Sequence, residues 1–243
     1  LNQKGTSVEY KMKSPVLVLT RNDGTGLYPL RDLAYTIEKC KNARNIIVLG
    51  EDQKLYFEQL KEALILLKKP YPEVVHYSFV LLKDSGKMST RSGEVVLLAE
   101  FIDEAVKKAQ AEIAKRKTKG DAKKIGIAAI KYALLRNDNN KNITFDWGQA
   151  LNFEGDTGPY LQYSYARASS ILRKSKPNKK KKLAKLIIPK LNEKETALIK
   201  EILNFSQIVE RAEKHLSPSI IANYAFQLAQ KFNEFYHTSH VLG

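Results

Sequence analysis

The chain has 243 residues, enough for one or two domains with a sizeable hydrophobic core. Its 43% hydrophobic and 28% charged residues are typical of a globular protein and argue against a disordered one. The 41 Lys and Arg residues exceed the 26 Asp and Glu residues, which gives a net charge of +15. This excess favours a polyanionic partner, although a lysine-rich organism whose proteins are all basic would produce the same composition.

Cysteine content and hydropathy indicate the cellular setting. Cys40 is the single cysteine, which excludes an intramolecular disulfide and fits a reducing, cytoplasmic compartment. The sequence has neither a signal peptide nor an apolar stretch long enough to span a bilayer, so we expect no membrane partner. The chain begins with Leu1 instead of methionine, and we interpret it as a piece of a longer protein.

The first part of the chain alternates apolar runs with amphipathic stretches. The apolar runs predict buried strands at residues 16–20, 45–50 and 74–82. Helical periodicity predicts helices at residues 30–40 and 53–69, the second with Tyr56, Leu60, Leu64 and Leu67 on one face. This alternation predicts βαβ units and a parallel sheet, in which ligands bind beyond the carboxyl ends of the strands. The loops at those ends are residues 21–28, 50–53 and 83–93.

From residue 100 onward the pattern changes to long helical periodicity. One apolar stripe consists of Phe101, Ala105, Ala109 and Ile113, and a second covers residues 125–135. Pro159 is a favourable first residue for a helix that runs to about residue 174. A lysine-rich connector at residues 174–185 precedes two predicted helices at residues 193–215 and 218–236. The predicted fold class is therefore α/β followed by all-α.

The loop at residues 86–93 has the composition of a polyphosphate site. Lys87 and Arg91 supply two cations, and Ser89 and Thr90 supply hydroxyl groups next to Met88. The flanking glycines would let backbone N–H groups approach a polyanion closely. This combination suits the triphosphate of a nucleotide, and a generic basic loop is the alternative.

Four motifs, in order and with similar spacing, resemble those of arginyl-tRNA synthetases, which are class I aminoacyl-tRNA synthetases. They are Asp-Gly-Thr-Gly-Leu-Tyr at residues 23–28 with Arg31 and Asp32, Gly-Glu-Asp-Gln at residues 50–53, a modified KMSKS loop at residues 88–96, and Phe-Glu-Gly-Asp-Thr-Gly-Pro-Tyr-Leu-Gln-Tyr at residues 153–163 with Arg167. Each motif is weakly specific alone, but together they cover roughly residues 14–173 and are specific to the family.

The resemblance implies a domain organisation and a reaction. It divides the chain into the second half of a Rossmann-type catalytic domain (1–98), a helical connector similar to a stem-contact fold (99–152) and a truncated helical anticodon-binding domain (153–243). The implied activity of the full-length parent is ATP-dependent activation of arginine and its transfer to the terminal adenosine of tRNA. ATP with Mg²⁺ would be a substrate, with no tightly bound cofactor, and we expect a monomer.

Two further expectations concern catalysis by the fragment. The family's His-x-Gly-His nucleotide motif does not occur in this chain, so we expect the fragment alone to be inactive. His237 and His240 lack an evident third partner, and we predict no metal site. The alternative function is that of a non-catalytic tRNA-binding paralogue that keeps the fold and the basic surface.

By resemblance, Asp32 would bind the guanidinium of arginine, Tyr28 would pack beside it, and Gln53 would hold the amino-acid backbone. A carboxylate can pair bidentately with a planar guanidinium, which supports this role for Asp32. Alternatively, Asp32 is a first-turn carboxylate that interacts with the helix dipole, Tyr28 is a core aromatic and Gln53 is a helix-start residue.

Two sets of residues would act on phosphate and tRNA. Thr90 stands where the common KMSKS loop has lysine, so Lys87 or Arg91 would have to stabilise the leaving pyrophosphate. The predicted anticodon-binding residues are Tyr160, Tyr163, Arg167 and, near the C-terminal end, Tyr236. The first three lie on one helix face, where aromatics and an arginine can stack unpaired bases. A core stripe with a surface arginine is the alternative.

Overall fold

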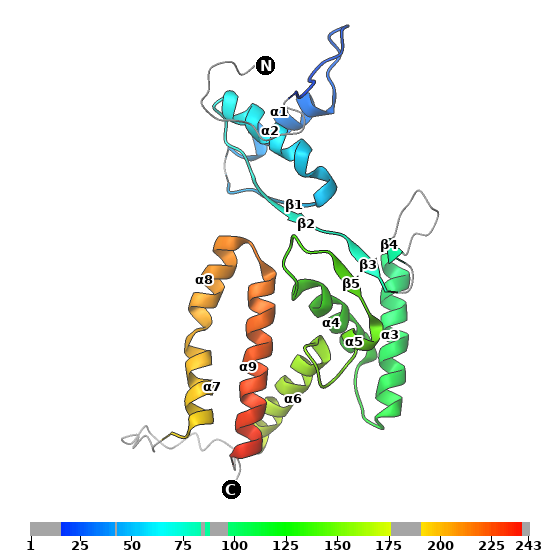
Figure 1. Cartoon of the computed structure of the whole chain (residues 1–243), viewed down its shortest axis with the longest axis vertical. Coiled ribbons are helices and arrows are strands. Elements are labelled where there is room, and N and C mark those ends of the chain that lie inside the picture. Colours follow the sequence, from blue (N-terminus) through cyan, green and yellow to red (C-terminus); the bar gives the residue numbers. More distant parts are fainter. Residues whose placement is uncertain (1–15, 42, 84–85, 88–96, 176–190, 240–243) are drawn as a thin grey trace. The chain divides into compact units, whose positions relative to one another are not determined.

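The computed structural model describes residues 16–41, 43–83, 86–87, 97–175 and 191–239 (Figure 1). The chain divides into two compact units, one formed by residues 1–79 with 139–141 and the other by residues 80–138 with 142–243. No helix in the described part of the chain is long and apolar enough to cross a membrane.

The first unit contains the predicted βαβ arrangement. Its elements are α1 (Tyr28–Lys39), β1 (Ile46–Gly50), the 3₁₀ helix η1 (Glu51–Gln53), α2 (Lys54–Leu66) and β2 (Glu73–Tyr77). Strands β1 and β2 are parallel, in a register that runs from Ile46 opposite Glu73 to Gly50 opposite Tyr77. Leu33 of α1 and Leu60 and Leu64 of α2 form the buried core, so the apolar faces predicted for these helices are confirmed.

Two strand predictions in this region are wrong. Residues 16–19 are assigned to no strand, and the run has only a single bridge between Thr20 and Gly26, because no neighbouring strand pairs with it within the described residues. The run at 74–82 is two strands, since Ser78 leaves the β1–β2 pairing. The Ser78 backbone N–H donates to the carbonyl of Asn139 at 2.8 Å, and its hydroxyl donates to Glu51 at 2.9 Å.

The second unit begins with a small mixed sheet and two packed helices. Strand β3 (Val80–Leu82) lies between β4 (Gly86–Lys87), which is antiparallel to it, and β5 (Ile143–Phe145), which is parallel. Helices α3 (Leu98–Lys115) and α4 (Ala122–Leu135) and the short α5 (Trp147–Ala150) complete this part. The predicted stripe on α3 is confirmed, because Ala105 and Ala109 are fully buried. Their small side chains allow α4 to pack closely against α3.

Among the described residues, the remainder of the second unit consists of four helices (Figure 1). They are α6 (Gly158–Lys174), α7 (Glu193–Leu203), α8 (Phe205–His215) and α9 (Pro218–Thr238), and the first three all contact α9. Thr157 caps α6 by accepting a hydrogen bond from the backbone N–H of Tyr160 at 3.2 Å. The lysine-rich connector lies mostly outside the described residues.

The prediction of one helix over residues 193–215 is wrong, because the helix breaks at Asn204. The backbone N–H of Asn204 is shared between the carbonyls of Lys200 and Glu201, at 3.1 and 3.2 Å. Such a shared bond tightens the last turn of α7.

A half-buried polar cluster joins α4 to the segment before α6 and to α9. The Tyr132 hydroxyl donates to Asp156 and lies 3.2 Å from the carbonyl oxygen of Ala222 on α9. Arg136 pairs with the same Asp156 carboxylate at 3.0 Å. Burial, together with the bond to Asp156, raises the pKa of Tyr132, so its hydroxyl remains a donor at neutral pH.

Candidate functional sites

Asp32 is held in a defined position at the start of α1. Tyr28 opens the helix with a side chain that is 79% exposed, and Asp32 follows one turn later and is half-buried. The Tyr56 hydroxyl of α2 donates a hydrogen bond to Oδ2 of Asp32. The neighbouring helix α2 therefore orients the carboxylate. A solvated carboxylate that interacted only with the helix dipole would not need such a partner.

Sequence reasoning missed this role of Tyr56, which we had assigned only to the apolar face of its helix. Burial first, and the hydrogen bond to Asp32 second, raise the pKa of Tyr56. The hydroxyl consequently stays protonated and donates to the carboxylate at neutral pH. No local pattern in the sequence marks this role, because Tyr56 becomes informative only when Asp32 is placed beside it.

Gln53 lies in the loop after β1, as predicted. It ends η1 and occupies the N-cap position of α2 without a side-chain capping bond. Its side chain is exposed, and its amide donates to Asp52 at 3.1 Å. Its neighbour Glu51 accepts the hydroxyl bond of Ser78, which ties the carboxyl ends of β1 and β2 together. Asp32 contacts α2 through Tyr56, and Gln53 immediately precedes that helix.

The segment before α1 is a tight turn, as its Asp-Gly sequence indicates. Gly24 has φ +84°, a conformation that other residues rarely adopt. The Asp23 carboxylate accepts a hydrogen bond from the backbone N–H of Thr25 at 2.9 Å, and this bond lowers the pKa of Asp23. These contacts shape the approach to Tyr28.

The KMSKS-like loop is described only at its first residues. Lys87 belongs to β4, where its backbone pairs with Leu81 of β3 in the second unit. The other predicted nucleotide-binding residues, Met88, Ser89, Thr90 and Arg91, lie outside the described residues. The roles of this loop therefore stay predictions.

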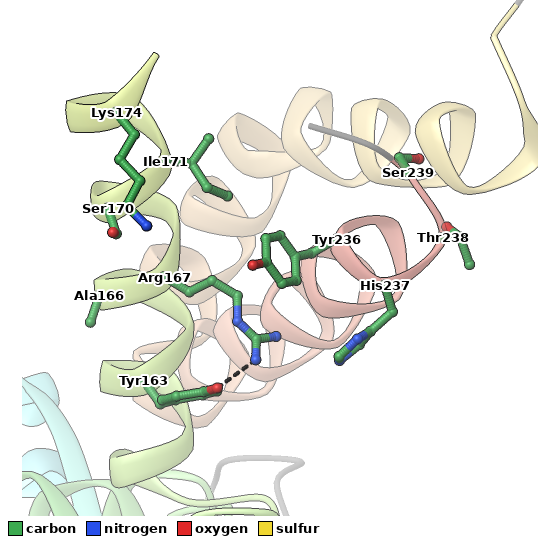
Figure 2. Close-up of a pocket in the computed structure, with 10 residues that line it drawn as sticks. All are labelled: Tyr163, Ala166, Arg167, Ser170, Ile171, Lys174, Tyr236, His237, Thr238 and Ser239. Carbon is green, nitrogen blue, oxygen red and sulfur yellow. Dashed lines mark hydrogen bonds between the residues drawn. The ribbon is translucent and has the colours of Figure 1, made fainter. Parts of the chain in front are cut away.

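A pocket of about 590 Å³ lies between α6 and α9 and contains three of the four predicted anticodon-binding residues (Figure 2). Arg167 has its guanidinium carbon 4.6 Å from the ring centre of Tyr163 and 4.5 Å from that of Tyr236. It also donates to the Tyr163 hydroxyl. The two tyrosines are 49% and 37% exposed, so their rings are accessible for stacking beside a fixed cation.

Tyr160 does not line this pocket. Its ring packs against Phe226 of α9, with ring centres 5.5 Å apart, and its hydroxyl accepts a hydrogen bond from Asn233 at 3.0 Å. Asn233 was missed in the sequence, because a lone asparagine in a helical pattern gives no signal of a contact with α6.

The described residues contain no group of three or more potential metal ligands. His237 lines the pocket between α6 and α9, with its ring 5.8 Å from that of Tyr236. His240 lies outside the described residues.

Comparison with known protein families identifies relatives of both parts of the chain. Residues 6–147 match the family described as tRNA synthetases class I (R), catalytic domain, and residues 161–243 match the DALR anticodon binding domain. An arginine–tRNA ligase from Methanocella arvoryzae is 43% identical over 234 residues, which are 93% of this chain and 40% of that protein. A second, from Methanothrix thermoacetophila, is 43% identical over 235 residues, with 93% and 41% covered.

A solved structure supports the same fold. Arginyl-tRNA synthetase from Thermus thermophilus superimposes with a TM-score of 0.81 at 26% identity, covering 96% of this chain and 45% of that one. The chain thus corresponds to a class I catalytic region followed by a helical domain, and the predicted fold class is confirmed. It spans about two-fifths of the length of the curated relatives it matches.

Proposed function

Because this chain belongs to the arginyl-tRNA synthetase family, we propose that the complete protein is an arginine–tRNA ligase. It activates arginine with ATP and Mg²⁺ to arginyl-adenylate and transfers the arginyl group to the terminal adenosine of its tRNA. The observation that carries the proposal is the match of residues 6–147 to the arginine-specific class I catalytic domain. This enzyme acts in the cytoplasm on soluble substrates.

Asp32 is the residue that selects arginine. Its carboxylate pairs with the substrate guanidinium, an always-charged, planar group whose donors match a carboxylate. Tyr56 supports this role, because its hydrogen bond orients the carboxylate without neutralising it. Tyr28 packs beside the substrate, and Gln53, at the carboxyl end of β1, holds the amino-acid backbone.

The loop after β4 acts on the nucleotide. Lys87, Met88, Ser89, Thr90 and Arg91 bind the phosphates of ATP, and Lys87 or Arg91 stabilises the charge that develops on pyrophosphate as it leaves. A cation acting in this way lowers the barrier more than it tightens ATP binding, because the charge develops only in the transition state.

The pocket between α6 and α9 binds the anticodon loop. Tyr163, Tyr236 and Arg167 offer two accessible rings and a cation that lies over both, which suits unpaired bases. The net charge of +15 adds long-range attraction to tRNA phosphates. The match to residues 161–243 supports an anticodon-binding region at 153–243. The catalytic-domain match extends over residues 6–147 and so covers both the proposed catalytic (1–98) and connector (99–152) regions, whose boundary stays a proposal.

The test is arginine-dependent ATP–pyrophosphate exchange and tRNA charging by the complete protein. We expect both activities, and neither from the present chain alone, which has no His-x-Gly-His motif. Tight tRNA binding without exchange or charging by the complete protein would instead indicate a non-catalytic tRNA-binding paralogue.

Asp32→Asn tests the substrate assignment within the same assay. Loss of a charge-assisted pair worth roughly 1.5–3 kcal/mol raises the KM for arginine by about one to two orders of magnitude. Glu38→Gln is the matched control, since Glu38 is on the same helix and pairs with Lys41 at the surface. An unchanged KM in Asp32→Asn would leave Asp32 as a structural carboxylate.

A further inference from the structure

Asn233 of α9 is a buried amide that makes three hydrogen bonds to α6. It is 8% exposed. Its Oδ1 accepts from Nη1 of Arg167 at 2.6 Å, and its Nδ2 donates to Tyr160 at 3.0 Å and to Ser164 at 2.8 Å. Burial of an amide is unfavourable unless its polar groups are satisfied, so packing alone does not explain an asparagine here.

The direction of these bonds is set by the chemistry of the partners. A guanidinium can only donate, so the amide oxygen must face Arg167. The Ser164 hydroxyl donates to the backbone carbonyl of Tyr160 at 3.0 Å, which leaves it to accept from Nδ2 of Asn233. The amide therefore has one favourable orientation, and its oxygen always faces Arg167.

The position of Arg167 in turn determines the shape of the pocket. Its guanidinium lies over both the Tyr163 and Tyr236 rings and donates to the Tyr163 hydroxyl. Arginine has a long side chain with many rotamers, and holding it in one costs conformational entropy. The short bond from Arg167 to Asn233 offsets that cost. Figure 2 shows Arg167 between Tyr163 and Tyr236 in this pocket.

We propose that Asn233 is the positioning residue of the anticodon pocket: it holds Arg167 between Tyr163 and Tyr236 so that the two rings are set for an unpaired tRNA base. The inference rests on the proposed function, because it assumes that the ligand is tRNA. Asn233 itself need not touch the RNA. Its effect on recognition passes through Arg167.

The test uses the complete protein and two tRNA transcripts, the cognate one and one with an altered anticodon. Discrimination is the ratio of their Kd values, and kcat and the KM for tRNA are measured in charging assays. Asn233→Leu keeps the side-chain size but removes all three bonds. We expect it to lower discrimination at least about tenfold and to raise the KM for cognate tRNA, with kcat at saturating tRNA unchanged.

Two conservative variants separate positioning from packing. Asn233→Asp keeps an acceptor for Arg167, and the Tyr160 hydroxyl can turn to donate, so discrimination should stay within about threefold of wild type. Ser164→Ala removes one bond of the cluster but none to Arg167 and should also keep discrimination. Asn223→Leu, an exposed asparagine on the same helix bonded to Arg136, is the matched control and should change nothing.

Three results would overturn the inference. The first is full discrimination between the two tRNAs in a folded Asn233→Leu protein. The second is loss of discrimination in a folded Asn233→Asp protein, and this variant provides the test if Asn233→Leu does not fold. The third is an additive effect of Asn233→Leu on discrimination in an Arg167→Ala background, since positioning requires that Asn233 act through Arg167. Failure of the wild-type protein to charge or bind tRNA would instead refute the proposed function.

Discussion

Replacing Gly158 with alanine would test the close approach of α6 to α4. An added Cβ would lie 2.3 Å from the carbonyl oxygen and 2.6 Å from the carbonyl carbon of Ala128, and 3.1 Å from the backbone nitrogen of Ala129. All three are backbone atoms of α4 and cannot rotate away as a side chain could. The two helices would have to separate by about 1 Å to restore the 3.4 Å of ordinary van der Waals contact.

Such overpacking costs about 1–3 kcal/mol, and the rigid neighbours place Gly158→Ala at the upper end, about 3 kcal/mol. At about 2–4 °C per kcal/mol for a domain of this size, we expect Tm to fall by about 6–12 °C. Thermal unfolding followed by circular dichroism, with urea denaturation as a second measure, would determine the change.

Gly155→Ala, in the turn just before α6, is the matched control. A Cβ at Gly155 would meet its nearest atom, Nδ2 of Asn152, at 3.4 Å, and we expect a change in Tm of less than about 2 °C. A Gly158→Ala protein that unfolds within about 2 °C of wild type would refute the reasoning, because it would mean that α6 and α4 can move apart at little cost.

The remaining predictions concern the proposed sites of the complete protein. Tyr56→Phe removes the bond that orients Asp32, so the KM for arginine should rise about three- to tenfold with kcat unchanged in pyrophosphate exchange; an unchanged KM would show that Asp32 needs no support. Lys87→Ala should lower the rate of activation far more than ATP affinity, and the reverse pattern would mean that the loop only tethers nucleotide. Replacing Tyr163 and Tyr236 together with alanine should abolish preference for the cognate anticodon while the slope of log K against log salt stays nearly constant, and retained preference would contradict the stacking role.

Short sequence windows predicted those parts of the fold that depend only on residues close together in the sequence. The periodicity of α3 and the alternation that gives β1, α2 and β2 are properties of short windows, and these elements are confirmed. The run at residues 16–20 reads as a strand in the same way, but a strand needs a partner, and its own sequence contains no information about one. Ser78 breaks its strand through contacts with Glu51 and Asn139, which no local pattern reveals.

In the candidate sites, too, some residues could be predicted from the sequence and others could not. Motif order indicated Asp32 and Arg167, yet the residues that hold them were not found from the sequence. Tyr56 contacts Asp32 across 24 positions of the chain, and Asn233 contacts Arg167 across 66. Such positioning residues carry no distinctive local signal, because an ordinary tyrosine or asparagine in a helix becomes informative only when its partner is placed beside it.

The cluster around Asp156 also limits how this protein can be dissected. Tyr132 of α4 and Arg136, which caps the end of α4, bind the Asp156 carboxylate, and Tyr132 lies beside the Ala222 carbonyl of α9. A recombinant fragment that started at residue 153 would keep Asp156 and the pocket residues but would lose α4. Its carboxylate would then face solvent without its tyrosine and arginine, and the backbone of Gly158 would no longer be covered. The smallest autonomous piece that preserves the pocket must therefore include α4, well upstream of the sequence motif that marks the start of the helical domain.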